Sequence, residues 1–426
     1  MNKHLPHDLK QMQSLPLEAK EIMSTERIKI WFESWKKYTI YNSKTKKTRY
    51  ITHSQEPNEN GCFVKKKKKD KTTGKKVEVE KLIKGTKLKP TEYIEAEKDG
   101  QVYVSFSGGI DSTVLADLCA RFCKMYGYTL YLLFVNTGLE YPEIQKFVKT
   151  FAEWLRNTHK IEVVLDIVRP EMRFDEVLKK YGYPVISKEV SETVSQARKS
   201  AKTGKYTYRL KKLDGELTDK SGNPSAFNMA KHKYLLDAPF PASASCCDVM
   251  KKRPAKKYEK ETGRKPFIGT MAAESRLRYQ KWLQHGCNAF EKSRPTSQPL
   301  SFWMNQDILH YIKKYNLPYC SVYGDIRVKP MDGELQEQIN IIDYLGCYEP
   351  EDTLETTGCD RTGCIFCMFG CNLEKEPNRF QRLKETHPRQ YEYCIGGGEM
   401  VDGKWQPNKK GLGLGKVLDY IGVKYD

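Results

Sequence analysis

Residues Tyr103–Leu118, with the sequence YVSFSGGIDSTVLADL, change from an apolar run typical of a strand to the periodic pattern of a helix. Ser107-Gly108-Gly109 lie where the pattern changes. Glycines let the backbone approach a phosphate closely, and the free N–H groups of a helix start favour negative charge. Asp111 would repel a phosphate, so its carboxylate is suited to holding Mg²⁺ or to capping the helix. With Ser107 and Ser112 as hydroxyl donors, the segment predicts a pyrophosphate cradle.

Other interpretations of this segment explain it less well. A plain strand-to-helix turn with Asp111 as its cap requires neither two glycines nor flanking serines. A Walker A loop requires Gly-Lys-Ser/Thr and the dinucleotide fingerprint requires G-x-G-x-x-G, and the segment contains neither.

Cysteines are the second group of residues that could do chemistry, and the chain has 13 of them. A Cys-x-x-Cys pair beside glycines suits zinc or an iron–sulfur cluster. Buried reduced thiols are the simpler interpretation for cysteines among apolar neighbours, namely Cys119, Cys123 and Cys287. The remaining cysteines of interest are the adjacent Cys246 and Cys247, and Cys359, Cys364, Cys367 and Cys371 of TGCDRTGCIFCMFGC.

The composition, 39% hydrophobic and 30% charged, is typical of a globular chain. No apolar run reaches the length of a membrane span, and the N-terminus does not lead into a signal peptide. We therefore expect a cytoplasmic protein with no membrane partner, in which the cysteines bind metal rather than form a disulfide framework.

The net charge of +19 is concentrated in one stretch. Residues 36–89 hold 18 Lys or Arg and 5 Asp or Glu, and Lys65–Lys69 are consecutive lysines. Such a run repels itself, so we expect a solvated loop or a disordered segment. The alternative is an arm that binds nucleic acid, because clustered lysines neutralise phosphates.

Strand and helix patterns alternate after this basic stretch. This alternation predicts an α/β fold, a parallel sheet with helices on both faces. Strands are expected at 102–106, 129–136, 161–168 and 266–270, and helices at 111–125 and 142–157. The expected segments are a helical N-terminus (1–35), a Lys-rich insertion (36–98), a nucleotide-binding domain (99–330) and a Cys-rich C-terminal segment (331–426).

These motifs together resemble the phosphoadenosine phosphosulfate (PAPS) reductase family of the PP-loop ATP-pyrophosphatase superfamily. SGGIDS (Ser107–Ser112) is similar to the PP-loop signature, and FVNTGLEYPE (Phe134–Glu143) to the second signature of the family. The segments CCDVMKKRPAKKY, IGTMAAESRLR, QPLSFWMNQDILHYIKKYNLPY and TGCDRTGCIFC follow in the order of the family. The likeness covers residues 100–395, is closest to the bacterial and phage branch, and implies an adenine nucleotide alpha-hydrolase-like fold.

The resemblance also implies a site for ATP or a related adenine nucleotide, with Mg²⁺. Arg276 and Arg278 of ESRLR, and Lys188 of PVISKE, are candidate cations for its anionic groups, because guanidinium forks match phosphate or sulfate. The implied catalytic residues are Asp111, Ser112, Lys188 and Arg276. The implied nucleotide-binding residues are Ser107, Gly108, Gly109, Asp111 and Ser112 for the phosphates, Thr137 and Gly138 for the adenosine, and Arg278.

Adenylyl-sulfate reductases of the same family hold a [4Fe-4S] cluster on a Cys-Cys pair and a distant Cys-x-x-Cys. The likeness therefore implies a cluster here, with Cys359 as a rival for one ligand position and zinc as the alternative metal. The implied ligands are Cys246, Cys247, Cys364 and Cys367.

One departure from the family bears on function. Thiol-dependent sulfonucleotide reductases resemble one another in a C-terminal Glu-Cys-Gly-His type motif whose cysteine attacks the sulfonate. This chain ends in VLDYIGVKYD and has no such motif, and Cys394 is the nearest substitute. Related PP-loop enzymes instead adenylylate an oxygen with ATP, release pyrophosphate, and let sulfur from a donor replace that oxygen.

We therefore predict α-phosphate chemistry coupled to cluster-assisted sulfur transfer, with a sulfur-donor protein as a partner. The alternatives are a true sulfonucleotide reductase that releases sulfite and a nucleic-acid-binding module with a vestigial nucleotide site.

Overall fold

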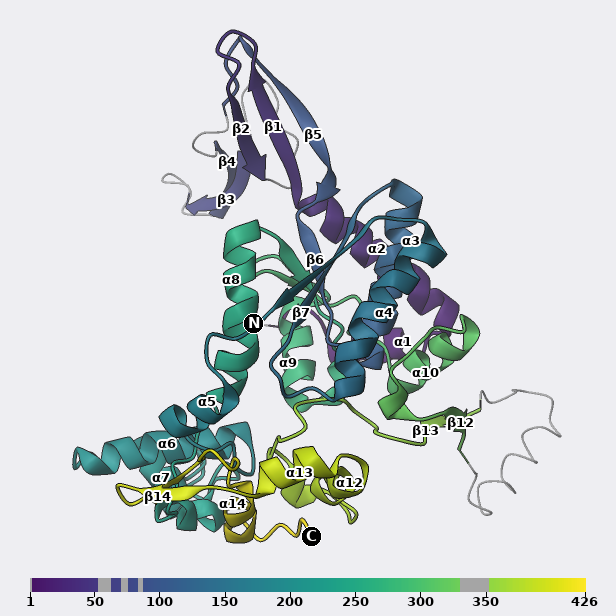
Figure 1. Ribbon diagram of the computed structural model, residues 1–426. Helices are drawn as coiled ribbons and strands as arrows, with labels where there is room; N and C mark the ends of the chain where they lie inside the picture. The colour runs from purple at the N-terminus through teal and green to yellow at the C-terminus, as the bar shows by residue number, and fades with distance from the viewer. Residues whose placement is uncertain (1, 53–62, 70–75, 83–86, 330–351) are drawn as a thin grey trace, which may run out of the picture. The chain divides into compact units, whose positions relative to one another are not determined.

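The computed structural model describes residues 2–52, 63–69, 76–82, 87–329 and 352–426 (Figure 1). The chain divides into two compact units, each built from separate stretches. Unit 1 comprises Met1–Phe134, Pro142–Ile167 and Tyr258–Arg361. Unit 2 comprises Val135–Tyr141, Val168–Lys257 and Thr362–Asp426.

Unit 1 is built on a six-stranded sheet. Its strands are β6 (Val102–Ser105), β7 (Leu130–Val135), β8 (Val163–Val168), β9 (Lys265–Phe267), β10 (Asn288–Ala289) and β11 (Thr296–Ser297). Their order is β10-β11-β9-β6-β7-β8. β6 is parallel to β7 and β9, and β9 is parallel to β11, whereas the edge strand β10 is antiparallel to β11. This mostly parallel sheet, flanked by helices, confirms the predicted α/β class.

The sequence of β6 explains its position inside the sheet. Residues 102–104 are all buried, which is typical of a parallel strand with both faces covered. The ring of Phe106, just beyond β6, stacks on Phe151 with centroids 5.5 Å apart. The helices that follow β6 and β7 are α3 (Ile110–Tyr126) and α4 (Pro142–His159).

The predicted helical N-terminus consists of two helices, and the second one, α2 (Leu17–Ser34), packs on β9. α2 buries Trp31 and Phe32, whose ring centroids lie 6.4 Å and 5.5 Å from that of Phe267. The remaining elements of this unit are α1 (Pro6–Gln13), α2 (Leu17–Ser34), η3 (Ala272–Glu274), α9 (Arg276–His285), α10 (Asn305–Lys314), η4 (Ser321–Tyr323), β12 (Ile326–Val328) and β13 (Leu354–Thr356). α8 (Arg253–Thr262) contains residues of both units.

Five strands are present in the described parts of the basic stretch before β6, which lack 53–62, 70–75 and 83–86. They are β1 (Lys36–Asn42), β2 (Thr48–Thr52), β3 (Phe63–Lys69), β4 (Lys76–Leu82) and β5 (Glu92–Gly100). β2, β1 and β5 form one antiparallel sheet in that order, which Figure 1 shows, and β3 pairs with β4 in a separate hairpin.

The expectation of a loop or a disordered segment at Lys65–Lys69 is therefore wrong. These lysines lie in β3, and the backbone register sets Lys65 opposite Glu80 and Lys67 opposite Glu78. Pairing with β4 gives the backbone of this run hydrogen-bond partners, which an isolated lysine run would lack.

A buried carboxylate links three helices of unit 1. Asp117 of α3 is 0% exposed. Its Oδ2 accepts hydrogen bonds from the Tyr311 hydroxyl (2.6 Å) and from Arg121 Nε (2.7 Å), and its Oδ1 lies 2.8 Å from His159 Nε2. Burial alone would raise the pKa of Asp117, but the hydrogen bonds from His159, Tyr311 and Arg121 outweigh it and lower the pKa.

Asp117→Asn is expected to destabilise unit 1 by about 3 kcal/mol at neutral pH, because it removes the buried charge to which Tyr311, His159 and Arg121 are bonded. A lowered pKa means that this stability is present above the usual carboxyl range and is lost as the pH falls through the folded-state value. The difference between the variant and the wild type should therefore shrink on acidification.

Urea unfolding followed by tryptophan fluorescence measures this, since five of the six tryptophans belong to unit 1. Tyr311→Phe, which removes one of the hydrogen bonds to Asp117, should lower the free energy of unfolding by about 1 kcal/mol. An Asp117→Asn variant as stable as the wild type would show that the carboxylate is replaceable.

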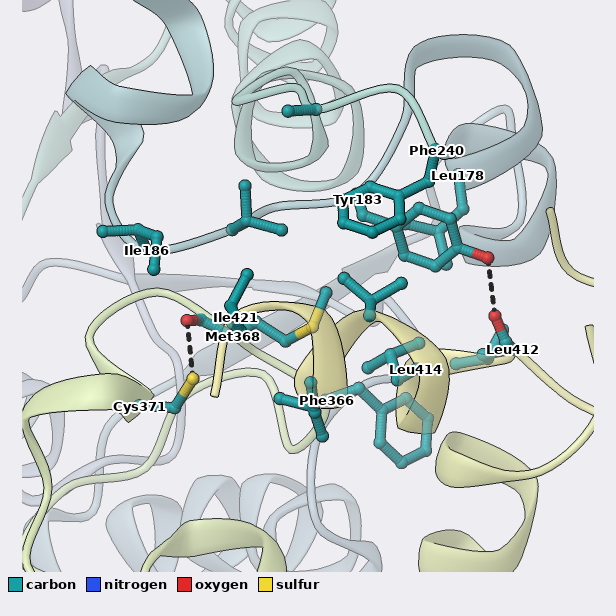
Figure 2. Close-up of a cluster of buried hydrophobic side chains, with 14 of the residues drawn as sticks. Leu178, Tyr183, Ile186, Phe240, Phe366, Met368, Cys371, Leu412, Leu414 and Ile421 are labelled. Carbon is teal, nitrogen blue, oxygen red and sulfur yellow. Dashed lines mark hydrogen bonds between the residues drawn. The ribbon is translucent and has the colours of Figure 1, made fainter. Parts of the chain in front are cut away.

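Unit 2 packs helices and a small hairpin around one hydrophobic core. Figure 2 shows Tyr183 and Phe240 together with Phe366 and Leu414 from the C-terminal stretch. The Tyr183 hydroxyl donates a hydrogen bond to the Leu412 carbonyl oxygen (2.9 Å). Residues 362–426 therefore share a core with residues 168–257.

The elements of unit 2 are α5 (Phe174–Tyr181), α6 (Lys188–Lys202), α7 (Tyr208–Asp214), η1 (Ala230–Leu236), η2 (Asp248–Lys252), η5 (Cys371–Leu373), α12 (Arg379–Thr386), α13 (Pro388–Ile395), β14 (Glu399–Val401), β15 (Lys404–Gln406) and α14 (Leu414–Tyr420).

Within the ranges that the structure describes, no helix combines the length and the apolar composition needed to cross a membrane.

Candidate functional site

The loop at residues 107–112 joins β6 to α3 in unit 1 and is closed by its own hydrogen bonds. The Ser112 hydroxyl donates to the Gly109 carbonyl oxygen (2.8 Å) and accepts from the Ser107 backbone N–H (3.2 Å). The Ile110 N–H donates to the Tyr323 hydroxyl oxygen (3.2 Å). These bonds hold the turn in the shape of a helix start.

Two glycines allow the loop to pack closely. Gly108 has a φ of +76°, and a Cβ there would lie 3.0 Å from Ile144 Cγ2 and 3.1 Å from Val148 Cγ2. A side chain at this position would be both strained and crowded. Gly269, just beyond β9, approaches the start of α3, since its Cβ would lie 3.0 Å from the Asp111 carbonyl oxygen. Sequence reasoning did not single out Gly269, although IGTMAAESRLR contains it.

Asp111 is half-buried in the first turn of α3, and two arginines act on it. Burial raises the pKa of the Asp111 carboxyl, while the charges of Arg361 and Arg278 oppose that rise. Both arginines pair with Glu274: Arg361 Nη2 lies 3.0 Å from its Oε1, and Arg278 pairs with its Oε2. Because burial disfavours its charge, the Asp111 carboxylate would gain from an added cation such as Mg²⁺.

The two arginines of ESRLR are placed differently. Arg278 belongs to the Asp111 group, whereas Arg276 is exposed at the first residue of α9. Ser275 caps this helix by accepting a hydrogen bond from the Arg278 N–H (3.3 Å). Sequence reasoning missed Arg361, which lies far along the chain in TGCDRTGCIFC, because nothing local marks its pairing with Glu274.

Thr137 and Gly138 follow β7 and belong to unit 2. The Thr137 hydroxyl donates to Glu140 Oε1 (2.6 Å), and its backbone N–H donates to Glu140 Oε2 (3.1 Å). Gly138 has a φ of +73°, and nothing lies within 4 Å of where its Cβ would be. Glu140, which sequence reasoning did not name, therefore shapes this turn, and Gly138 leaves open space beside it.

Four cysteines of unit 2 influence one another's ionisation. Cys246 donates a hydrogen bond to Cys247, which raises the pKa of Cys246, and burial and the charges of Cys247, Cys367 and Cys364 raise it further. The same bond lowers the pKa of Cys247. Burial raises the pKa of Cys364 to about 11 and also raises that of Cys367. Residues from two distant stretches thus meet in one place.

Two lysines accompany these thiols. Lys188 hydrogen-bonds to Cys247 and, together with Lys251, lowers the pKa of that thiol. Burial would lower the pKa of Lys251, but Cys364, Glu140 and Cys247 outweigh it and raise the pKa. The ammonium groups offset negative charge on the sulfurs.

The backbone places the Cys-Cys pair at the start of a helix that contains a π turn. Cys246 and Cys247 begin the helix, and residues Asp248–Lys252 form the π segment η2, closed by the Arg253 N–H and the Asp248 carbonyl oxygen. π turns are frequent at functional sites. Lys251 lies within this π segment.

The Cys-x-x-Cys loop is held from both sides. The Ile365 N–H donates to the Leu139 carbonyl oxygen (2.8 Å), and Arg379 Nη1 donates to the Cys367 carbonyl oxygen (2.9 Å). The Cys367 N–H also donates to the Cys364 carbonyl oxygen (3.1 Å). The loop is therefore attached to the turn that contains Thr137.

A strained residue precedes Lys188. Ile186 has a φ of +58°, which is costly for a β-branched side chain. The Gly370 N–H donates to the Ile186 carbonyl oxygen (2.8 Å), and the Ile186 side chain is 8% exposed. The turn leads into α6, where the Ser187 hydroxyl accepts from the Val190 N–H (3.1 Å) and Lys188 is the first helical residue.

The four thiols are suitable metal ligands, but the described side chains are not arranged at the distances of a metal site. In the part of the chain that the structure describes, no group of three or more His, Cys, Asp or Glu side chains is arranged to hold a metal ion. The four thiols are the soft ligands that zinc and iron–sulfur clusters prefer. The chemistry of these residues therefore fits such a group.

The other cysteines have different environments. Cys359 belongs to unit 1, near Cys320. Burial raises the pKa of Cys320, and Glu143 and Cys359 raise it further. Cys394 is 0% exposed in α13, and burial raises the pKa of its thiol well above the usual value. A buried, protonated thiol is a poor nucleophile. Cys394 is therefore unsuited to replace the cysteine that attacks the sulfonate.

Comparison with known proteins assigns the chain to a family. No curated protein matches it. The family model described as "Phosphoadenosine phosphosulfate reductase domain" matches residues 101–218 and 219–368, which include the 107–112 loop, Arg361 and all four thiols of the cysteine group. The matched region extends from β6 to the Cys-x-x-Cys loop, and it includes the mostly parallel sheet and the glycine loop at the start of α3. This chain therefore belongs to the phosphoadenosine phosphosulfate reductase family.

Proposed function

We propose that the chain binds ATP, or a close adenine nucleotide, and transfers its adenylyl group with release of pyrophosphate. The observation that carries this proposal is the 107–112 loop, closed by its own hydrogen bonds, with Asp111 beside Arg278 and Arg361. Family membership supports an adenine nucleotide as the substrate and a PP-loop enzyme as the class.

Catalysis in this proposal comes from positioning and charge neutralisation. The amides of the loop and the N-terminus of α3 would bind the phosphates, and the Ser107 hydroxyl would donate to them. The Ser112 hydroxyl would donate to them only after its proton leaves the Gly109 carbonyl oxygen. Asp111 would hold Mg²⁺, and Arg278 with Arg361 would neutralise the leaving pyrophosphate. An acceptor oxygen bonds to the α-phosphorus as the bond to the pyrophosphate oxygen breaks.

The remaining candidate residues have proposed roles of their own. Thr137 and Gly138 would contact the adenosine, and the open space beside Gly138 is compatible with that role. Lys188 and the exposed Arg276 would supply positive charge to the nucleotide or to the acceptor.

We also propose that Cys246, Cys247, Cys364 and Cys367 would hold a [4Fe-4S] cluster. A bound cluster supplies thiolate-ligated iron that can carry sulfur or electrons. Lys188 and Lys251 would offset the negative charge of the ligated thiolates. The support is the donor set and its two cations. Nucleophilic sulfur from a donor protein would complete the transfer by bonding to the acceptor in place of the activated oxygen, which leaves as part of AMP.

A sulfonucleotide reductase is the competing function within the family. That reaction requires a thiol that attacks a sulfonate, and the burial of Cys394 argues against it. Nucleic-acid binding through the lysines of β3 is a second proposal, which the +13 charge of residues 36–89 supports.

The test is a pair of assays on anaerobically purified protein. We expect Mg²⁺-dependent exchange of labelled pyrophosphate into ATP, and no sulfite from PAPS with a dithiol donor. Sulfite release without exchange would favour the reductase. If neither reaction occurred, the chain would be a binding module rather than an enzyme of this kind.

A further inference from the structure

Unit 2 contains a second basic region, which the proposed reaction does not use. Residues 196–233 hold 10 Lys or Arg and 3 Asp or Glu. Within it, α6 and α7 pack together, because Arg209 Nε donates to Gln196 Oε1 (3.0 Å) and the Lys205 N–H donates to the Ser200 carbonyl oxygen (3.2 Å). We use the name α6–α7 surface for six exposed residues, Lys199, Lys202, Lys205, Tyr206, Tyr208 and Lys211.

Helical spacing gathers these residues. Lys199 and Lys202 are three positions apart at the end of α6, so they share a helix face. Tyr208 and Lys211 are likewise three apart on α7. Tyr206 lies in the turn between the helices, and Lys211 Nζ is 5.9 Å from the centroid of its ring.

The Tyr206 ring is anchored at one edge. Its hydroxyl oxygen lies 2.8 Å from Asp214 Oδ2 and 2.6 Å from Glu216 Oε2, which share its one proton, and Lys233 Nζ lies 2.7 Å from Asp214 Oδ1. The nearby carboxylates are thus engaged by a hydroxyl and an ammonium. The side chains of Tyr206 and Tyr208 are nevertheless 52% and 58% exposed, so both rings present surface to solvent.

Other basic residues of this region serve the fold instead. Arg198 donates hydrogen bonds to four backbone carbonyls, those of Leu235, Leu236, Ala238 and Phe240. Lys212 is buried and pairs with Glu189. In contrast, among the described residues no ion pair involves Lys199, Lys202 or Lys205. Lysines near the end of a helix interact favourably with its dipole, which accounts for the presence of Lys199 and Lys202 in the last turns of α6. The dipole does not account for a lysine at position 205 or for the exposed tyrosines.

We propose that the α6–α7 surface binds single-stranded nucleic acid. Lysines neutralise phosphates while exposed aromatic faces stack on bases, and single-strand sites combine these two features. An anionic membrane would use the lysines alone, and a duplex offers no unstacked base to the tyrosines. The proposal goes beyond the nucleotide reaction and does not depend on it.

The test measures the anisotropy of a fluorescein-labelled oligothymidine of about 20 nucleotides, titrated with the full chain at several salt concentrations. Tyr208→Ala should weaken binding about tenfold, whereas Tyr208→Phe, which keeps the ring, should stay within about twofold. The Lys202→Ala/Lys205→Ala double variant should reduce the log–log salt slope by roughly 1.4, at about 0.7 per phosphate contact. The matched control, Lys409→Ala/Lys410→Ala, changes the charge of the same unit equally at two other exposed lysines and should leave the slope unchanged.

Several outcomes would overturn the proposal. One is a reduction of the salt slope in the control Lys409→Ala/Lys410→Ala as large as that in Lys202→Ala/Lys205→Ala. Another is that Tyr208→Ala binds the oligothymidine as tightly as the wild type, while replacement of Lys65–Lys69 by serine abolishes that binding. Binding to phosphatidylserine vesicles that depends on Lys202 and Lys205, together with undiminished oligothymidine binding in Tyr208→Ala, would assign the surface to membranes. Asp111→Asn should bind the oligonucleotide like the wild type, so failure of the proposed reaction can be distinguished from failure at this surface.

Discussion

Asp111→Asn is expected to reduce ATP–pyrophosphate exchange at least about a hundredfold. The amide has the shape of the carboxylate but not its charge, so it would hold Mg²⁺ poorly at the start of α3. The measurement is incorporation of labelled pyrophosphate into ATP at saturating Mg²⁺. Asp325→Asn is the matched control, because it makes the same change at an exposed aspartate of the same unit and should leave exchange intact. Equal exchange in the wild type and Asp111→Asn would exclude the loop as the catalytic cradle.

The same substitution should raise the free energy of unfolding at neutral pH. Burial raises the pKa of Asp111 in the folded chain, so folding favours its protonated form, even though Arg361 and Arg278 oppose the effect. The stability that accompanies a raised pKa is present at low pH and is lost as the pH rises through the folded-state value. Asparagine, which stays neutral, would keep that stability.

The stability difference between Asp111→Asn and the wild type should therefore grow from about pH 3 to about pH 7. Thermal unfolding followed by tryptophan fluorescence measures it. A variant that is less stable than the wild type at neutral pH would mean that the carboxylate serves mainly to balance the two arginines. A variant that is inactive but more stable would indicate a charge kept for function at a cost in stability.

Single Cys→Ala substitutions at four positions are expected to remove most of the iron, the acid-labile sulfide and the brown absorbance after anaerobic purification. Each of these thiols would be a cluster ligand, and loss of one thiolate opens the iron it holds. Iron and sulfide assays together with the visible spectrum measure the effect. The four positions are Cys246, Cys247, Cys364 and Cys367.

The chain offers matched controls for these variants. Cys371 lies four residues beyond Cys367, but its thiol is buried and donates to the Met368 carbonyl oxygen (3.0 Å), so Cys371→Ala should keep the iron (Figure 2). Cys119→Ala should keep it as well. A colourless wild type with stoichiometric zinc would refute the cluster. If Cys359→Ala lost its iron and Cys246→Ala kept it, Cys359 would replace Cys246 as a cluster ligand.

Local sequence determined much of this protein. The apolar run of β6, the turn at Gly108 and the apolar period of α3 follow from neighbouring residues, because backbone freedom and side-chain spacing are local properties. The predicted strand and helix order, and with it the α/β class, was therefore correct. The motif order within residues 100–395 was enough to place the chain in its family, which the match over 101–368 confirms.

The tertiary structure decided which distant residues meet. Arg361 and Arg278 act on Asp111 only because separate stretches of unit 1 fold together. Likewise, residues 362–426 share a core with residues 168–257, which brings the Cys-x-x-Cys loop to the Cys-Cys pair. Such pairings depend on contacts between residues far apart along the chain, and no local period or spacing encodes them.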